Sequence, residues 1–136
     1  MSDKKKEITF DYDKGAAQMN DIYCGIVPPG PKGAGRFTDL MIPYLFGELW
    51  NEEILSIRDR RLFTMGIIAA MGEYDVFTIQ AMAALKREEL TAEQLSELAT
   101  HAAPYAGYPR SGGLLNAVSN AINAINAINN EKKNEK

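Results

Sequence analysis

One side chain in this sequence is suited to proton transfer near neutral pH. It is His101, the only histidine in the chain, and imidazole has an ordinary pKa close to neutrality. Tyr105 follows four residues later, so the two share one face of a predicted helix. We therefore treat His101 as a candidate acid or base and Tyr105 as a candidate substrate-binding residue. The alternative is that His101 is a structural residue hydrogen-bonded between helices.

A second group of candidates lies along one predicted helix, Tyr74–Lys86. Glu73, Val76 or Phe77, and Gln80 recur at a spacing that places them on one helix face. Glu73 is a candidate proton carrier if burial raises its pKa. The alternative is a solvated carboxylate favoured by the positive end of the helix dipole. Gln80 can orient a carboxylate or carbonyl through hydrogen bonds, but an amide cannot carry a proton at this pH.

An aromatic and acidic group precedes them in the chain. Tyr44, Glu48 and Trp50 lie close together in sequence, and Arg60 follows. An arginine can hold a substrate carboxylate in a bidentate pair, so we include all four as candidate substrate-binding residues. The alternative is a structural ion pair between Glu48 and Arg60, because partly buried acidic and basic residues normally pair.

Cysteine and metal chemistry have little support in this sequence. Cys24 is the only cysteine, so it cannot form an internal disulfide. A lone cysteine is most often a small buried hydrophobic residue. One histidine without a cysteine cluster does not make a zinc-type ligand set. We expect no metal site and no cofactor.

The elements that must position these residues are all predicted to be helices. Val27–Gly35 contains three prolines and three glycines and is predicted to be a loop. Pro43 predicts a kink or a break, Ser56 with Asp59 a helix cap, and Thr91 with Gln94 a capping box. The expected helices, about six in number, are Tyr12–Tyr23, Phe37–Trp50, Ile57–Met71, Tyr74–Lys86, a helix from Thr91 to about Gly107, and a last helix from Ser111 or Gly112 to about Ile128.

Two of these helices carry unusual apolar patterns. Ile57–Met71 has no polar stripe in its second half, which predicts a helix buried on all sides, often within an oligomer. The last helix ends in a three-residue repeat with Ile122, Ile125 and Ile128, whose period of 3 drifts around a helix of 3.6 residues per turn. That slanting stripe could pack on a neighbouring subunit, or the asparagines could make it a fraying tail.

Length and composition indicate one soluble, globular domain, and the predicted helices make its expected fold class all-α. The chain has 136 residues, 46% of them hydrophobic and 24% charged. We expect a flexible leader (1–8), a helical domain (9–130) and a charged tail (131–136). Six lysines lie at the two ends and the body between them is acidic, so nucleic acid is not an expected partner. Neither a signal peptide nor a membrane span is predicted, and the cytoplasm is the expected compartment.

Several motifs together resemble the carboxymuconolactone decarboxylase family, whose relatives include alkyl hydroperoxidase D-like proteins. The resemblance covers nearly the whole chain and rests on five matches in order. They are Tyr12-Asp13-Lys14-Gly15, Gly47-Glu48-Leu49-Trp50, Arg58-Asp59-Arg60-Arg61-Leu62, Thr91-Ala92-Glu93-Gln94-Leu95 and Tyr105-Ala106-Gly107-Tyr108-Pro109. The last is the most specific, and the histidine before it, His101, also occurs in many members.

The resemblance implies a helical bundle that forms a homotrimer or homohexamer with active sites near subunit contacts. It implies decarboxylation of a small carboxylated lactone, or peroxide reduction by a cysteine pair. Peroxidase members carry Cys-x-x-Cys-x-x-x-His where this chain has Glu73, Val76 and Gln80, and Arg61 replaces a usual serine. The leading hypothesis is a lyase acting on a small carboxylated or lactone substrate. The alternatives are a small-molecule-binding protein without this chemistry and, least favoured, a peroxidase that uses Cys24 alone.

Overall fold

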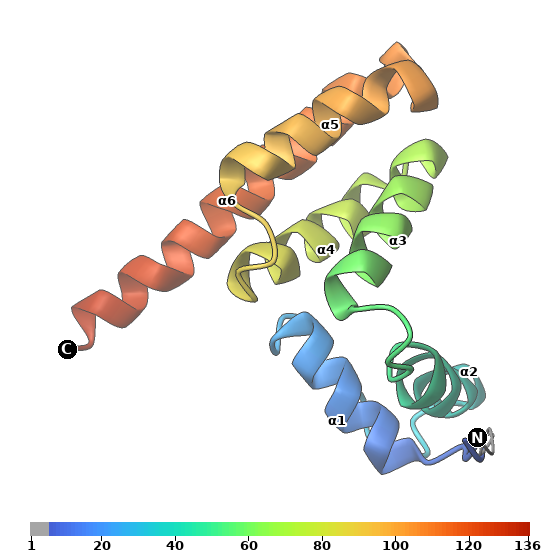
Figure 1. Ribbon diagram of the computed structural model, residues 1–136. Coiled ribbons are helices and arrows are strands. Elements are labelled where there is room, and N and C mark those ends of the chain that lie inside the picture. The colour runs from blue at the N-terminus through green and yellow to red at the C-terminus, as the bar shows by residue number, and fades with distance from the viewer. Residues whose placement is uncertain (1–5) are drawn as a thin grey trace. The chain divides into compact units, whose positions relative to one another are not determined.

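The chain is all-helical in the computed structural model, which describes residues 6–136. It divides into two compact units, unit 1 (Met1–Leu55) and unit 2 (Ser56–Lys136), which we describe separately. Six α-helices account for most of the described residues, as Figure 1 shows, and no strand occurs among them. The predicted fold class is therefore confirmed. Most of the predicted leader, residues 1–5, lies outside the described residues.

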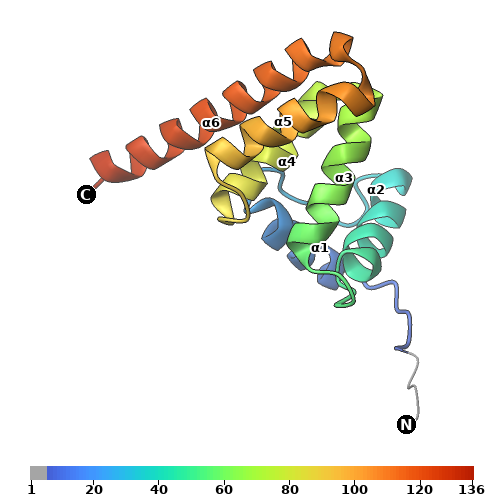
Figure 2. The same cartoon turned by 45° about the horizontal axis from the view of Figure 1, so that its top comes forward.

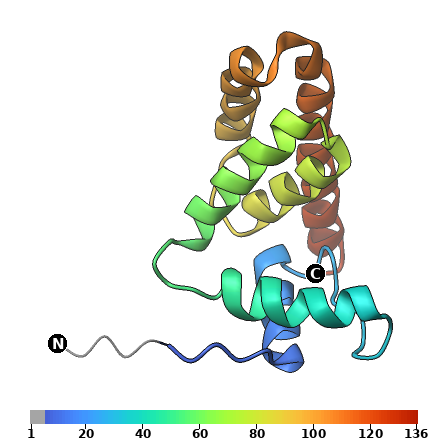
Figure 3. The ribbon, with the colours of Figure 1, turned by 90° about the vertical axis from the view of Figure 1, so that its right-hand side faces the viewer.

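Unit 1 is built on a close crossing of two helices. Helix α1 (Tyr12–Tyr23) has the predicted bounds, and the Asp11 side chain caps it by accepting from the Lys14 N–H. It packs across the helical segment η1 (Ile42–Leu49), as Figure 3 shows. Gly15 lies at the crossing, where a Cβ atom would stand 2.4 Å from the Ile42 carbonyl oxygen. Only a glycine lets the two backbones approach this closely.

Pro43 changes the winding of the second helix without ending it. Helix α2 (Arg36–Met41) continues directly into η1, which is a π-helix. Proline has no N–H and its ring clashes with the carbonyl four residues earlier, so the α-helical hydrogen-bond pattern cannot pass through it unchanged. The wider π pattern persists to the Trp50 N–H, which donates to the Leu45 carbonyl at 2.9 Å. The predicted kink or break is thus a change of helix type.

Unit 2 contains the remaining helices, and two of them begin with the side-chain caps that local sequence predicts. The Ser56 side chain accepts from the Asp59 N–H at 3.0 Å, and Thr91 and Gln94 form the predicted capping box. The helices are α3 (Ile57–Met71), α4 (Tyr74–Lys86), α5 (Ala92–Ala106), the short 3-10 segment η2 (Tyr108–Arg110) and α6 (Ser111–Asn134). Figure 2 shows α5 lying alongside α6.

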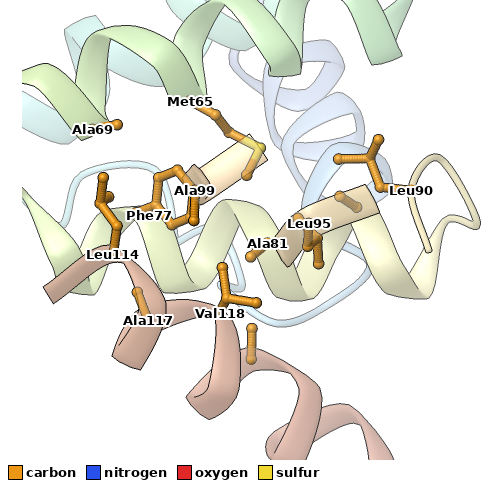
Figure 4. Close-up of a cluster of buried hydrophobic side chains, with 12 residues drawn as sticks. Met65, Ala69, Phe77, Ala81, Leu90, Leu95, Ala99, Leu114, Ala117 and Val118 are labelled. Carbon is orange, nitrogen blue, oxygen red and sulfur yellow. The ribbon is translucent and has the colours of Figure 1, made fainter. Parts of the chain in front are cut away.

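The core of unit 2 lies where α4 and α5 each pack against α3 and α6. It is a continuous cluster that joins Met65 and Ala69 of α3 to Phe77 and Ala81 of α4 and to Leu114 of α6. Figure 4 shows Met65 and Phe77 among the side chains of this cluster. Alanines at the contacts let the helix axes come close, so a few large side chains fill the remaining space.

Within the single chain, α3 is not buried on all sides, and the expected burial within an oligomer stays a prediction. Its fully buried residues are Arg61, Met65 and Ala69, whereas Phe63 is 74% exposed and Met71 is 64% exposed. The physical reason is its position in unit 2, where α4 and α5 pack against only part of its circumference. Uniform hydrophobicity along a helix does not specify how many of its sides have neighbours.

The last helix is longer than its sequence suggests. It continues past Ile128 to Asn134. Glu131, Lys132 and Lys133 are good helix formers, and lysines near a helix C-terminus are favoured by the helix dipole. Ile125 is buried, Ile122 packs against the unit 2 core and Ile128 is half-buried. Over the described residues, no helix is long and apolar enough to cross a membrane.

Candidate functional site

The candidate site in unit 2 is a hollow of about 740 Å³ lined by α3, α4 and α5. His101 and Tyr105 of α5 both line it. Their ring centroids are 5.4 Å apart, as expected for residues four apart on a helix. Both side chains are exposed, and Tyr105 is 83% exposed. The polar groups of the hollow therefore lie at its rim, within reach of solvent and of a ligand.

The rest of the hollow is apolar. Its floor includes Met65 and Phe77, each 2% exposed, and Ala69, which is 1% exposed. Leu62, Phe63 and Leu98 contribute to the walls, and the other lining residues are alanines and one glycine, Gly66. On α3, the small residues Gly66, Ala69 and Ala70 lie within about one helical turn. Their short side chains leave open space on this side of the hollow. A pocket of this size, apolar with a few polar groups, is typical of small-molecule sites.

Gln80 lies in the interior of unit 2 and does not line this hollow. It is 2% exposed, and its Oε1 accepts a hydrogen bond from the Arg61 Nη1 at 2.8 Å. The resemblance implies a histidine at position 80 and a serine at position 61. The two departures from the family pattern are therefore in direct contact, across 19 positions of sequence.

Arg61 is the residue that sequence reasoning did not select. Its side chain is 1% exposed, and its Nε donates to the Glu89 carboxylate, which is 8% exposed. Arg87 also donates to Glu89, at 3.1 Å. A buried guanidinium needs such partners, since removing an ion from water is expensive. The sequence signal was the unusual Arg58-Asp59-Arg60-Arg61 run at the start of an otherwise apolar helix.

Glu73 and Arg60 lie elsewhere in unit 2. Glu73 is exposed at the N-cap of α4, makes no side-chain capping hydrogen bond and does not line the hollow. Arg60 is half-buried in the first turn of α3 and does not line it either. Of the three predicted catalytic residues, the structure places only His101 at the hollow. The roles of Glu73 and Arg60 stay predictions.

The remaining candidates, Tyr44, Glu48 and Trp50, belong to unit 1. Glu48 accepts from the Thr9 N–H at 3.0 Å and from Lys14 Nζ at 3.4 Å. The Thr9 hydrogen bond is the main cause of a lowered pKa for this carboxyl, and Lys14 lowers it further against the opposing effect of burial. Tyr44 contacts Phe10 and is 53% exposed, whereas Trp50 is buried. An ion pair between Glu48 and Arg60 would join the two units, and it stays a prediction.

Cys24 lies at the end of α1, in the left-handed conformation, with its Sγ 3.7 Å from the Asp21 carbonyl oxygen. It is half-buried in unit 1. Across residues 6–136, no group of three or more histidine, cysteine, aspartate or glutamate side chains is arranged to hold a metal ion.

Comparison with known proteins adds an independent finding. The sequence pattern of the carboxymuconolactone decarboxylase family matches residues 35–120. A 4-carboxymuconolactone decarboxylase from Acinetobacter baylyi (strain ATCC 33305 / BD413 / ADP1) is 28% identical to this chain over 79 residues. The match spans 58% of this chain and 58% of that relative. No solved structure matches the chain.

Proposed function

This chain belongs to the carboxymuconolactone decarboxylase family, and on that premise we propose that it is a lyase that acts on a small carboxylated or lactone substrate. The substrate binds in the hollow lined by α3, α4 and α5. The observation that carries the proposal is the placement of His101, the only histidine of the chain, at the rim of an apolar hollow.

Decarboxylation needs few protein groups. The bond between the carboxylate carbon and its neighbour breaks, carbon dioxide leaves, and the electron pair passes into an adjacent carbonyl as an enolate. A proton must then return to carbon. The apolar hollow holds the body of the substrate away from water, and His101 at the rim is the group that supplies the proton, with Tyr105 beside it to orient the carboxylate.

The test is carbon dioxide release from 4-carboxymuconolactone, the compound in the name of the similar Acinetobacter protein. General acids contribute about 10²–10⁴-fold to a rate, so we expect His101→Gln to lower kcat at least about a hundredfold. Glu93→Gln is the matched control, because Glu93 is exposed on α5 and lies outside the hollow. Equal rates in His101→Gln and in the wild type would remove His101 from the reaction.

We keep the proposed roles of Glu73, Gln80 and Arg60 beside that of His101, as roles that substitutions can test. A fall of at least tenfold in Glu73→Gln would include Glu73 in proton transfer, and a wild-type rate would exclude it. Gln80→His restores the residue that the family resemblance implies. A silent wild type with activity in Gln80→His would mean that the framework supports decarboxylation while the present site takes another ligand.

A second candidate function is small-molecule binding without turnover. The contact between Gln80 and Arg61 favours it, because both positions depart from the family pattern and hold each other in the interior. This alternative expects no carbon dioxide release from any small acid but a raised Tm when one binds.

We also propose a cytoplasmic homotrimer or homohexamer. The exposed apolar face of α3, with Phe63, Ile67 and Met71, supports an assembly because single chains rarely leave large apolar side chains grouped in water. Analytical ultracentrifugation of the full chain tests this, and a monomer at micromolar concentration would contradict it.

A further inference from the structure

The polar and charged groups around the α3–α4–α5 hollow restrict the class of ligand that it can bind. Among the residues that line it, only His101 and Tyr105 have polar side chains, and there is no lysine or arginine. Arg61, the buried cation nearby in sequence, is engaged by Glu89 and Gln80. The hollow therefore offers one polar place, at the rim, and an apolar floor.

This distribution of polar groups limits the number of carboxylates that a bound ligand can carry. A carboxylate at the rim keeps part of its hydration and can accept hydrogen bonds from the His101 imidazole and the Tyr105 hydroxyl. A second carboxylate at the far end of the same molecule would lie against Met65, Ala69 and Phe77, which are almost fully buried. Burying a charge without a partner is strongly unfavourable, because the charge loses its hydration. An apolar ring in that position has no charge to desolvate, and its burial removes apolar surface from water, which is favourable.

We propose that the hollow selects a monocarboxylate with an apolar, ring-sized body. The carboxylate lies at the His101–Tyr105 pair and the ring lies over Met65 and Phe77. This inference rests on the site named in the proposed function, and it departs from the dicarboxylate that 4-carboxymuconolactone would be. It concerns binding, so it does not depend on turnover.

Gly66 provides a way to close the hollow without disturbing the fold. It is exposed on α3, lines the hollow, and a Cβ atom there would have no neighbour within 4 Å. Gly66→Leu therefore adds a side chain to the hollow while removing a helix-weakening glycine. Gly112→Leu is the matched control, since Gly112 is also an exposed helical glycine with no neighbour within 4 Å, and it lies on α6 outside the hollow.

The experiment uses the single histidine as a site-specific probe. The imidazole carbon–proton NMR signal of His101 is followed at constant pH while benzoate or terephthalate is added to the full chain. The two probes share one ring and differ by a second carboxylate at the opposite end. We expect saturable shifts with benzoate, binding of terephthalate at least tenfold weaker, a loss of at least tenfold in benzoate affinity in Gly66→Leu, and wild-type affinity in Gly112→Leu.

Terephthalate binding as tight as benzoate binding would overturn the proposal, because it would require a cation at the floor. No benzoate-dependent shift, or shifts unchanged in Gly66→Leu, would show that the hollow does not bind such a ligand. Benzoate binding with no release of carbon dioxide from any substrate would count against the lyase alone and would leave this inference standing.

Discussion

The buried ion pair between Arg61 and Glu89 makes a quantitative prediction about stability. Glu89→Gln keeps the shape of the side chain and removes its charge. Arg61 would then lose its carboxylate partner while remaining in an environment where its side chain is 1% exposed. Because Arg61 is on α3 and Glu89 lies in the loop between α4 and α5, the pair joins α3 to this loop.

The structure supports a large effect. Removing one partner of a buried ion pair typically costs about 3–5 kcal/mol. We expect about 3 kcal/mol for Glu89→Gln, at the low end, because the Gln carbonyl can still accept a hydrogen bond from Arg61. That equals roughly a hundredfold change in the ratio of folded to unfolded protein. Arg87, the other cation that contacts Glu89, has a side chain that is 21% exposed. Arg87→Gln should therefore lower the free energy of unfolding by about 1 kcal/mol or less.

The assay is urea unfolding followed by circular dichroism at one fixed protein concentration, since assembly makes stability depend on concentration. A third variant separates charge from shape. Arg61→Met combined with Glu89→Gln removes both charges, so no buried guanidinium is left without a carboxylate partner. The double variant should therefore be more stable than Glu89→Gln alone.

Two results would refute this reasoning. A loss of less than about 1 kcal/mol in Glu89→Gln would mean that Arg61 is not a desolvated charge. A double variant less stable than Glu89→Gln would mean that Arg61 acts by packing and hydrogen bonding, and that its charge is not what Glu89 compensates.

Three further predictions concern other parts of the molecule. Gly15→Ala should lower Tm by several degrees, because the added Cβ would stand 2.4 Å from the Ile42 carbonyl oxygen. The cost of overpacking, about 1–3 kcal/mol, exceeds the gain of about 1 kcal/mol in helix propensity. An unchanged or higher Tm would contradict the close crossing. Glu48→Gln should be less stable than the wild type at pH 7. The difference in stability should shrink as the pH falls below the ordinary carboxyl pKa of 4.5 and vanish only below the lowered pKa of the folded state. The sign follows because a pKa lowered by folding contributes stability above that range and loses it as the pH falls, so an equal difference at pH 7 and in acid would refute it. Tyr105→Phe should weaken benzoate binding in the His101 NMR titration and leave Tm unchanged, because its hydroxyl is exposed at the rim; unchanged affinity would exclude the hydroxyl from the site.

Local sequence was sufficient to place most helices. The bounds of Tyr12–Tyr23, Ile57–Met71 and Tyr74–Lys86 match the structure, and so does the capping box at Thr91. These features depend on residues a few positions apart, such as a side chain that caps the next turn or a glycine that ends a helix. The motif resemblance also led to the family that the comparison found.

Which side chains line the hollow and which lie in the interior could be learned only from the tertiary structure. Val76 and Gln80 share a helix with Phe77, yet only Phe77 lines the hollow and only Gln80 meets Arg61. The exposed face of α3 and the π-helix after Pro43 likewise depend on which neighbours are present and on how the chain accommodates a missing N–H.

The sequence by itself determined the helices, their caps, the family and His101 as the group most suited to proton transfer, because each depends on residue type and short-range spacing. Only the tertiary structure decided that Arg61 and Gln80 hold each other in the interior and that His101 stands at an apolar hollow. Contacts between distant residues depend on how helices pack, and periodicity along one helix carries no record of which other helix will cover each of its faces.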